Sequence, residues 1–513
     1  MSLSVATILA ESARRYPDKV AAVQGPQQVT YAELWEQARR YAAVLRDRGI
    51  ARGDRVGLLI PNVLDFPRCY YAALALGAVV VPVHALLTSD EVAATLRDAE
   101  ASLLVATGPL VESGAKGAEL AGVPLLTTMT PEDSPYERLE GLAAYVEPLT
   151  TYEPCEAGSD AVILYTSGTT GRSKGAVLSH LNLTLNAHLS ATEVVQLVGD
   201  DVILGCLPLF HSFGQTCAMN AGFRAGATLV LMPRFVGAQA LELMQAHEVS
   251  VFMGVPTMYL GLLDAVAAGG RPTPLRIAVS GGASLPVTVI DRFKDAFGGD
   301  IYEGYGLSET SPVATFNQPV FGRRPGTIGH PIWGVEVEVA RADIDEHVEL
   351  LAHGELGEIV VRGHNVMTGY WRQPEATAEA VVDGWLRTGD LGVIDDDGFV
   401  AIVDRKKDMV IRGGFNVYPR EVEEVLARHP AVAQVAVIGL PDERQGEEVC
   451  AVVRLAGDAE DRPQEEVAQE IVTWSRGQLA AHKYPREVRF VEEFPLGPSG
   501  KVLKRELVAR YRR

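Results

Sequence analysis

The sequence predicts an α/β protein in which a large N-terminal domain, built from two parallel-rich sheet subdomains with helices plus a β-rich subdomain, precedes a small α+β C-terminal domain. Apolar strands alternate with segments of helical period as far as about Gly326, and shorter strands with polar alternation follow. The pattern changes again at Asp404. A chain of 513 residues also exceeds the size that one hydrophobic core supports.

The first element is predicted to be an amphipathic helix. Its apolar face is broken by Glu11, so the N-terminal stretch lacks the long apolar run of a signal peptide. The stretch YYAALALGAVVVPVHALL from Tyr70 has nearly the length of a membrane span, but Gly77, Pro82 and His84 interrupt it. A helix followed by a buried strand explains this stretch better, and we expect a cytoplasmic protein without an integral membrane segment.

Apolar segments between residues 55 and 282 predict the strands of the parallel sheets. They are RVGLLIP (55–61), AVVVPV (78–83), ASLLVAT (101–107), DAVILYT (160–166), ATLVLMP (227–233), VSVFMGVP (249–256) and RIAVSGG (276–282). The segments 241–248 and 287–297 between or after them have apolar residues at helical spacing. This alternation predicts parallel sheets with helices on both faces.

The β-rich subdomain is predicted for about 326–403, where VEVEVAR, GEIVVRG and GFVAIVD are separated by glycine turns. The N-terminal domain is therefore expected to span residues 1–403. A run of cations with two adjacent glycines follows, so we place a hinge at 404–407 and the C-terminal domain at 408–513.

Charge and cysteine content exclude several classes of protein. The net charge of -20 argues against nucleic acid or an anionic membrane surface as the main partner, so a phosphate ligand needs local cations, a metal or backbone amides. The five cysteines form no CxxC pair and are odd in number. They are expected to be reduced core thiols, not a disulfide framework or a zinc site.

The stretch YTSGTTGRSKG at 165–175 is typical of a loop that holds a polyphosphate. Its glycines allow backbone amides to approach an anion, its hydroxyls can donate hydrogen bonds, and Arg172 and Lys174 bring positive charge. It is not a Walker loop, because Lys174 is followed by Gly175. A flexible surface loop is the alternative interpretation of such a run.

Seven motifs occur together in order. They are YTSGTTGRSKG, LPLFHSFG at 207–214, SGGASL from 280, YEGYGLSET from 302, TGDLG from 388, DRKKDMVIRGGFNVYP from 404 and PSGKVLKREL from 498. This set resembles the adenylate-forming superfamily of acyl- and aryl-CoA synthetases, luciferases and amino-acid adenylation domains, and is closest to fatty acyl-CoA ligases. The resemblance implies attack of a carboxylate on the α-phosphorus of ATP, giving acyl-AMP and pyrophosphate, followed by acyl transfer to a thiol. ATP, Mg²⁺ and CoA are the implied cofactors and substrates.

The resemblance assigns the phosphate contacts to the loop after Tyr165, through amides, hydroxyls and one ammonium group. The residues with this role are Thr166, Ser167, Gly168, Thr169, Thr170, Gly171 and Lys174. A second stretch is expected to run its backbone along the adenine and the acyl-phosphate, where side chains would clash. That stretch is Gly281, Gly282 and Ala283.

The stretch YGLSET carries further implied roles. Tyr305 would stack on adenine next to Gly306, and Ser308 would bind the α-phosphate. The family more often has threonine at 308, and serine keeps the hydroxyl with a freer χ1. Glu309 would ligate Mg²⁺, a cation that prefers oxygen ligands.

The remaining nucleotide contacts come from later motifs. The resemblance implies that Asp390 accepts hydrogen bonds from the ribose hydroxyls and that Arg405 reaches the ribose or phosphate side. Lys501 follows PSG in a loop near the end of the C-terminal domain and would bridge the carboxylate and the α-phosphate in the first step. Lys504 and Arg505 are expected to be solvated helix charges.

The C-terminal domain is expected to be mobile. Lys501 and the GGFNVYP loop lie at opposite ends of its sequence and cannot both reach one reaction centre, so the domain is inferred to rotate between the two steps. Lys407 would be the hinge. Gly413 and Gly414 would line a tunnel for a pantetheine arm, although an ordinary tight turn is the alternative.

His211 stands between two phenylalanines, where a histidine can simply pack, but in CoA-forming relatives this position gates the acyl site and orients the carboxylate. The expected acyl pocket consists of Phe210, Phe213, Val255, Met258, Tyr259 and Val313. These residues are apolar, and relatives that activate amino acids usually carry aspartate where His211 stands, so an aliphatic monocarboxylic acid fits best.

The sequence therefore predicts an ATP-dependent ligase that activates a medium- or long-chain fatty acid and transfers it to CoA. One alternative transfers the acyl group to the phosphopantetheine of an acyl carrier protein. Another is a catalytically inactive nucleotide-binding protein on the same fold. An inactive protein is disfavoured, because the sequence contains all four of the residues Lys174, Glu309, Asp390 and Lys501.

Overall fold

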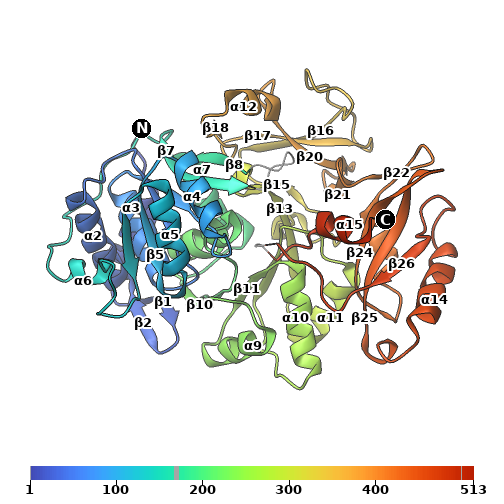
Figure 1. The fold of residues 1–513 in the computed structure, drawn as a ribbon, viewed down its shortest axis with the longest axis horizontal. Coiled ribbons are helices and arrows are strands. Elements are labelled where there is room, and N and C mark those ends of the chain that lie inside the picture. The colour runs from blue at the N-terminus through green and yellow to red at the C-terminus, as the bar shows by residue number, and fades with distance from the viewer. Residues whose placement is uncertain (1, 167–172, 498–499, 513) are drawn as a thin grey trace.

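A computed structural model describes residues 2–166, 173–497 and 500–512 of the protein (Figure 1). The helix α1 (Ala6–Arg15) comes first, as predicted. Among the described residues, no helix combines the length and the apolarity that crossing a bilayer requires. All five cysteines are described, and each is buried without a disulfide partner.

The first sheet has the strand order β18-β8-β7-β4-β3-β5-β6. Its strands are β3 (Arg55–Leu59), β4 (Val79–Pro82), β5 (Ala101–Thr107), β6 (Leu125–Thr128), β7 (Asp160–Thr166), β8 (Lys174–Ser179) and β18 (Gly369–Tyr370). Its helices are α2 (Tyr31–Asp47), α3 (Asp65–Ala75), α4 (Ser89–Asp98), α5 (Val111–Ala121) and α6 (Leu139–Ala143). The strands from β7 to β6 are parallel, whereas β8 and β18 are antiparallel additions.

Helices cover both faces of this sheet, because alternate residues of β5 belong to different hydrophobic clusters. Leu103 and Val105 pack in the cluster that contains α2 and α3, and Leu104 and Ala106 pack in the cluster that contains α4 and α5. The strand is therefore apolar at successive positions, which is the pattern that its sequence showed.

The second sheet has the order β15-β14-β13-β12-β11-β9-β10-β1-β2. Its strands are β1 (Val20–Gln24), β2 (Gln27–Thr30), β9 (Val202–Gly205), β10 (Thr228–Leu231), β11 (Val251–Gly254), β12 (Ile277–Ser280), β13 (Ile301–Gly306), β14 (Val313–Phe316) and β15 (His330–Pro331). Its helices are α7 (His180–Leu189), α8 (Ala221–Ala225), α9 (Gly237–Ala246), α10 (Pro256–Ala267) and α11 (Val287–Phe297). The central strands are parallel, and both edges carry antiparallel strands.

The β-rich subdomain is an antiparallel sheet of β16 (Val335–Ala340), β17 (Gly357–Gly363), β20 (Trp385–Ile394), β19 (Val381–Val382) and β21 (Val400–Arg405). The helix α12 (Pro374–Ala380) lies beside it. The strand β18 leaves this region and pairs with β8, so the subdomain is joined to the first sheet by backbone hydrogen bonds.

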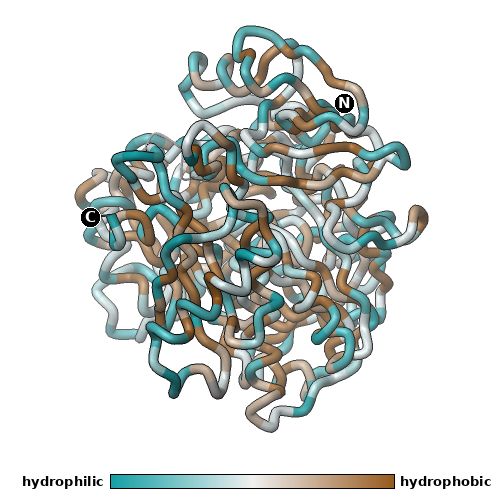
Figure 2. Tube along the Cα trace, turned by 90° about the vertical axis from the view of Figure 1, so that its right-hand side faces the viewer, coloured by the Kyte–Doolittle hydropathy of each residue, from teal (hydrophilic) through white to brown (hydrophobic). Residues whose placement is uncertain are grey.

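The C-terminal region has its own hydrophobic clusters. It contains β22 (Val410–Arg412), β23 (Phe415–Val417), β24 (Val432–Asp442), β25 (Gly446–Leu455), β26 (Glu487–Phe490), α13 (Pro419–Leu426), α14 (Gln464–Arg476) and α15 (Lys504–Tyr511). Figure 1 shows this region, in orange and red, against the end of the second sheet near β13. In Figure 2 the hydrophobic segments run mainly through the interior of the trace and hydrophilic ones through the outer loops.

The predicted hinge at 404–407 begins inside a strand. Asp404 and Arg405 are the last residues of β21 and pair with Leu391 and Asp390 of β20. The chain leaves β21 after Arg405 and enters the C-terminal sheet at Val410. The domain boundaries and the pivot at Lys407 stay predictions.

Lys504 is not a solvated helix charge, so the expectation for this residue was wrong. Its Nζ lies 2.7 Å from Oε1 of Glu423, which ties α15 to α13. Burial alone lowers the pKa of this lysine, but the carboxylates of Glu423 and Asp404 outweigh it and leave the pKa raised. The lysine is held by carboxylates that lie far from it in the sequence.

Candidate active site

A cavity of about 1660 Å³ lies where the two sheets, the β-rich subdomain and the C-terminal region meet. Most of the residues predicted to act in catalysis or nucleotide binding, among those that the structure describes, contribute to its wall. They are Thr166, Lys174, His211, Gly281, Gly282, Tyr305, Gly306, Ser308, Glu309, Asp390 and Lys501. Arg405 and Lys407 line it as well. The structure therefore brings together motifs that are spread over more than 300 positions of the sequence.

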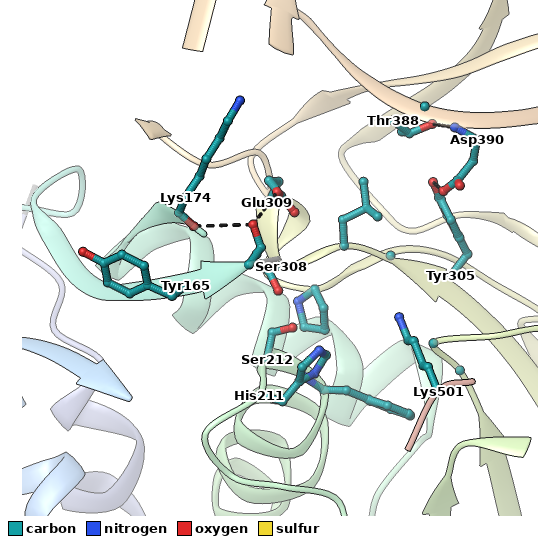
Figure 3. A pocket seen from close by; sticks show the side chains of 18 of the residues that line it. Tyr165, Lys174, His211, Ser212, Tyr305, Ser308, Glu309, Thr388, Asp390 and Lys501 are labelled. Carbon is teal, nitrogen blue, oxygen red and sulfur yellow. Dashed lines mark hydrogen bonds between the residues drawn. The ribbon is translucent and has the colours of Figure 1, made fainter. Parts of the chain in front are cut away.

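Tyr305, Asp390 and Arg405 form one polar cluster in this cavity. The Tyr305 hydroxyl donates to Oδ2 of Asp390 at 2.6 Å (Figure 3). Nε of Arg405 lies 3.1 Å from Oδ1 of the same carboxylate. Burial, and then the Asp390 charge, raise the pKa of Tyr305 well above its usual value, so the phenol stays protonated and donates. The 3% exposed carboxylate of Asp390 is thus fixed between two partners.

A buried ion pair supports the turn that carries Asp390. Nη2 of Arg387 lies 2.6 Å from Oε2 of Glu358, and the two side chains are only 7% and 4% exposed. The other oxygen of Glu358 accepts the N–H of Gly389 at 2.9 Å. One carboxylate therefore holds both the arginine and the backbone of the TGD turn.

Replacing Glu358 with alanine is expected to destabilise the protein by about 3 kcal/mol, because it leaves the Arg387 guanidinium buried without its partner. The midpoint of thermal unfolding, followed by circular dichroism, measures the loss. Arg362 and Glu336 form a matched, exposed pair between β16 and β17, with Nη2 2.6 Å from Oε2. Glu336→Ala should leave the midpoint unchanged, and equal shifts in the two variants would contradict the prediction.

Glu309 lies in the turn η4 (Ser308–Thr310) and points towards β7. Its Oε1 accepts the Tyr370 hydroxyl at 3.0 Å and the Thr166 hydroxyl at 3.5 Å. The ammonium of Lys174 lies 5.0 Å from the centre of the Tyr370 ring. Lys174 is the first residue of β8 and pairs with Thr166, so the ends of the predicted phosphate loop are held together by an antiparallel strand pair.

Lys501 enters the cavity from the C-terminal region (Figure 3). Its loop is held by the Thr257 hydroxyl, which donates to the carbonyl of Gly500 at 3.0 Å. A Cβ on Gly282, whose φ is +81°, would lie 3.1 Å from Cε of Lys501, so the lysine stem passes close over this glycine. Burial, and then the charge of Arg405, lower the pKa of Lys501 to about 8.

His211 also lies against the cavity. Burial, and then the charge of Lys501, lower the pKa of His211 to about 3, so its ring is neutral. Its Nδ1 accepts the N–H of Phe213 at 3.3 Å, which places the proton of the neutral ring on Nε2. A gate that orients a carboxylate and a packing residue are both compatible with this arrangement.

The structure does not bring every predicted residue to the cavity. Phe210, Phe213 and Val313 line it, whereas Val255, Met258 and Tyr259 lie behind its wall. Tyr259 is fully buried and packs edge-on against Phe252 and Phe293. The segment 255–259 leaves β11 into α10, and its large side chains turn towards the core.

Three further glycine or alanine positions lie elsewhere. Ala283 is exposed beyond the cavity wall. Gly413 and Gly414 form the turn between β22 and β23, with φ of +57° and +82°, and do not line the cavity in this conformation. The predicted phosphate ligands Ser167, Gly168, Thr169, Thr170 and Gly171 lie outside the described residues.

Sequence reasoning missed several residues of the site. Tyr370 contacts the predicted ligand Glu309, and the pair Glu358 and Arg387 supports the turn that carries Asp390, but none of the three belongs to the seven motifs. His84 lines the cavity with its ring centre 4.4 Å from that of Phe210. The sequence shows that His84 interrupts an apolar run, but it does not show that His84 lies beside Phe210 in the cavity.

Two protein-family models match this chain. The family model described as "AMP-binding enzyme" matches residues 9–371, and "AMP-binding enzyme C-terminal domain" matches residues 421–501. The chain belongs to the AMP-binding enzyme family. The first match contains four of the seven motifs from which the resemblance was drawn, and the second reaches Lys501 of the last motif, so the superfamily predicted from the sequence is confirmed.

Relatives of this AMP-binding enzyme include a long-chain-fatty-acid–CoA ligase of Bacillus subtilis, 35% identical over 98% of this chain and 93% of the relative. A feruloyl-CoA synthase of an Amycolatopsis species is 36% identical over 97% of each chain. ATP-bound MatB from Rhodopseudomonas palustris superposes with a TM-score of 0.88 at 34% identity over 100% of this chain and 99% of that one. A benzoate CoA ligase from Burkholderia xenovorans gives 0.88 at 29% identity over 98% and 99%. These likenesses confirm the predicted fold class.

Proposed function

We propose that this AMP-binding enzyme is an ATP-dependent acid–thiol ligase that activates a medium- or long-chain fatty acid as acyl-AMP, releases pyrophosphate and transfers the acyl group to CoA. Family membership and CoA-ligating relatives support the AMP-forming acid–CoA ligase activity. That the substrate is a fatty acid is the more specific part of the proposal. This part rests on the uncharged apolar wall of the cavity.

The first step requires a carboxylate to approach a triphosphate. Lys501 is the cation that reaches the cavity from the C-terminal region, and it would neutralise charge between the carboxylate and the α-phosphate. Asp390, fixed by Tyr305 and Arg405, would accept hydrogen bonds from the ribose. Lys174 and Thr166 would bind the outer phosphates. Each side chain holds a reactant in place, which lowers the entropy cost of bringing two anions together.

Glu309 fits a magnesium ion bound together with ATP. Groups of three His, Cys, Asp or Glu side chains that could hold a metal by themselves do not occur in the described part of the chain. Mg²⁺, however, is commonly bound through one or two carboxylates together with substrate phosphates, and Glu309 lines the cavity beside the Thr166 hydroxyl. When bound, the ion would neutralise phosphate charge.

The acyl wall, as we call the apolar side of the cavity, favours a long monocarboxylic acid. Its members come from the β4–α4 connection and α4, the π-helical turn η2 (Ser190–Val194) and the residue after it, the loop before the π-helical turn η3 (Phe213–Asn220) and η3 itself, and β14. They are Val83, Leu87, Ala94, Val194, Val195, Phe210, Phe213, Cys217, Val313 and Phe316. Within the described residues, the lysines and arginines of the cavity all come from other elements. A dicarboxylic acid would therefore bury its second charge without a partner.

The thiol acceptor has one alternative. An acyl carrier protein presents the same phosphopantetheine arm as CoA, and Gly413 and Gly414 would serve either arm after domain rotation. The relatives that ligate CoA favour free CoA. An inactive nucleotide-binding protein is disfavoured, because pure binding has no need of the cation Lys501 in the cavity.

A pyrophosphate-release assay tests this proposal. The enzyme, ATP and Mg²⁺ are combined with straight-chain acids of increasing length and with malonate, benzoate, ferulate and amino acids, each with CoA or with holo acyl carrier protein. We expect turnover on the alkanoates, rising with chain length until the cavity is filled, and dependence on CoA. Faster turnover with ferulate or benzoate would overturn the fatty-acid assignment, and turnover that needs the carrier protein would overturn the CoA assignment.

A further inference from the structure

Among the polar side chains beside the acyl wall, Ser212 and His84 have buried polar atoms without a partner in the described residues. Ser212 and His84 both line the cavity next to Phe210 and Phe213. The Ser212 side chain is 1% exposed, and its Oγ has no hydrogen-bond partner within the described residues. Nε2 of His84 is likewise buried without a partner in the part of the chain that the structure describes.

The hydroxyl of Ser212 does not cap the helical turn that it precedes. Ser212 is the N-cap residue of η3, a position where a serine hydroxyl usually accepts a backbone N–H of the first turn. Here the side chain makes no capping bond, and Nδ1 of His211 accepts the N–H of Phe213 instead. The Ser212 hydroxyl therefore stays available, and Figure 3 shows it among the side chains that line the cavity.

The free nitrogen of His84 is a donor. Nδ1 of His84 accepts the N–H of Leu86 at 2.8 Å. Burial lowers the pKa of His84 to about 4, so the ring is neutral and its proton lies on Nε2. The wall thus presents an N–H that has no protein acceptor among the described residues.

These groups lie near the reacting end of the acid. The ring of His211 is close enough to both Lys501 and His84 for their charges to affect it. Ser212 follows His211 directly, and Lys501 is the residue to which we assign the carboxylate. An alkyl chain cannot satisfy a buried hydroxyl or N–H, and each unpaired group costs stability. An oxygen on one of the first carbons of the acid can accept a hydrogen bond from either group.

We propose that Ser212 and His84 determine specificity, and that the preferred acid carries a hydroxyl or oxo group on the second or third carbon. The inference rests on the proposed function and narrows its substrate class. Ser212 and His84 would hydrogen-bond this oxygen, while the rest of the chain packs along the acyl wall. The step of adenylation itself is unchanged.

The test compares kcat/KM for adenylation of an alkanoate with that of its 2-hydroxy, 3-hydroxy and 3-oxo derivatives of equal length. The wild-type enzyme is expected to prefer an oxygenated acid by about tenfold or more, because the site's polar groups are otherwise unpaired. Ser212→Ala and His84→Phe should each reduce this preference by about tenfold, with little effect on the unsubstituted acid.

Thr216→Val is the matched control. The Thr216 hydroxyl is also buried without a described partner in η3, but it does not line the cavity. This variant should keep the wild-type preference. Equal rates on substituted and unsubstituted acids in the wild type, or equal losses on both in Ser212→Ala, would overturn the inference and leave the fatty-acid ligase standing. Failure of every alkanoate, substituted or not, would instead overturn the proposed function.

Discussion

Lys501→Ala is expected to lower the rate of acyl-AMP formation by about 10²–10³-fold while ATP still binds. Lys501 is the cation that the C-terminal region places over Gly282, in the cavity that Asp390 and Glu309 also line. Removing it leaves the charge that develops between carboxylate and α-phosphate without its nearest neutralising group. Pyrophosphate exchange measures the first step, and isothermal titration calorimetry measures ATP binding.

Two comparisons separate a catalytic role from a structural one. Thiol transfer from supplied acyl-AMP to CoA should be nearly unaffected in Lys501→Ala, because the lysine is assigned to the first step alone. Lys406→Ala removes another lysine that lines the cavity, but this side chain is 44% exposed and pairs with Asp345 at 3.2 Å. Its loss should have a small effect. Adenylation at the wild-type rate in Lys501→Ala would refute the assignment.

Because the pKa of Lys501 is lowered, the rate of adenylation is expected to depend on pH. The ammonium is charged below its pKa of about 8 and loses its proton above it. The kcat/KM for adenylation, which reports the free enzyme, should therefore fall as pH rises through about 8. Bound ATP favours the charged ammonium, so the corresponding limb of the kcat profile should move to higher pH. A flat profile up to pH 10 in kcat/KM would contradict this role.

Glu309→Gln is the second change with a large expected effect. Replacing the carboxylate by an amide keeps an oxygen that can accept the Tyr370 hydroxyl, but it removes the charge that we propose binds Mg²⁺. We expect adenylation to fall by about 10²-fold, and half-maximal activity to need a higher Mg²⁺ concentration. Initial rates over a series of Mg²⁺ concentrations at fixed ATP measure both effects.

Tyr370→Phe is the control for this prediction. It removes the hydrogen bond at 3.0 Å that orients Glu309 but leaves the carboxylate. The variant should lose much less activity, and its Mg²⁺ dependence should stay close to that of the wild type. If both variants lose activity equally without a change in Mg²⁺ dependence, Glu309 acts through hydrogen bonding and not through a metal.

The strands could be predicted because their signal is local. Each apolar segment between 55 and 282 that was predicted as a strand contains a strand in the structure, since a strand covered on both faces is apolar at successive positions. The antiparallel additions could not be predicted in the same way. The residues of β18, Gly369 and Tyr370, pair with Val177 and Ala176 of β8, which lie 192 and 194 positions away, and two residues carry no periodicity.

The acyl pocket shows the same limit at the level of side chains. The apolar segment 255–259 and the aromatic residues of 207–214 look alike in sequence, yet Phe210 and Phe213 line the cavity while Tyr259 packs against Phe293. Which face of α10 meets the core depends on the packing of α11 and β11. Composition predicts that such a segment is buried, but not on which side.

By itself the sequence determined the α/β class, the order of its strands along the chain and the motif set of an adenylate-forming enzyme, because these depend on residues close together in the chain. Only the tertiary structure decided that Tyr370 holds Glu309 and that Glu358 supports the turn of Asp390. It also decided that Ser212 and His84 lie beside the acyl wall with polar atoms that have no partner among the described residues. These relations join distant segments, and hydrogen bonds and burial act through distance in space, which the order of residues does not contain.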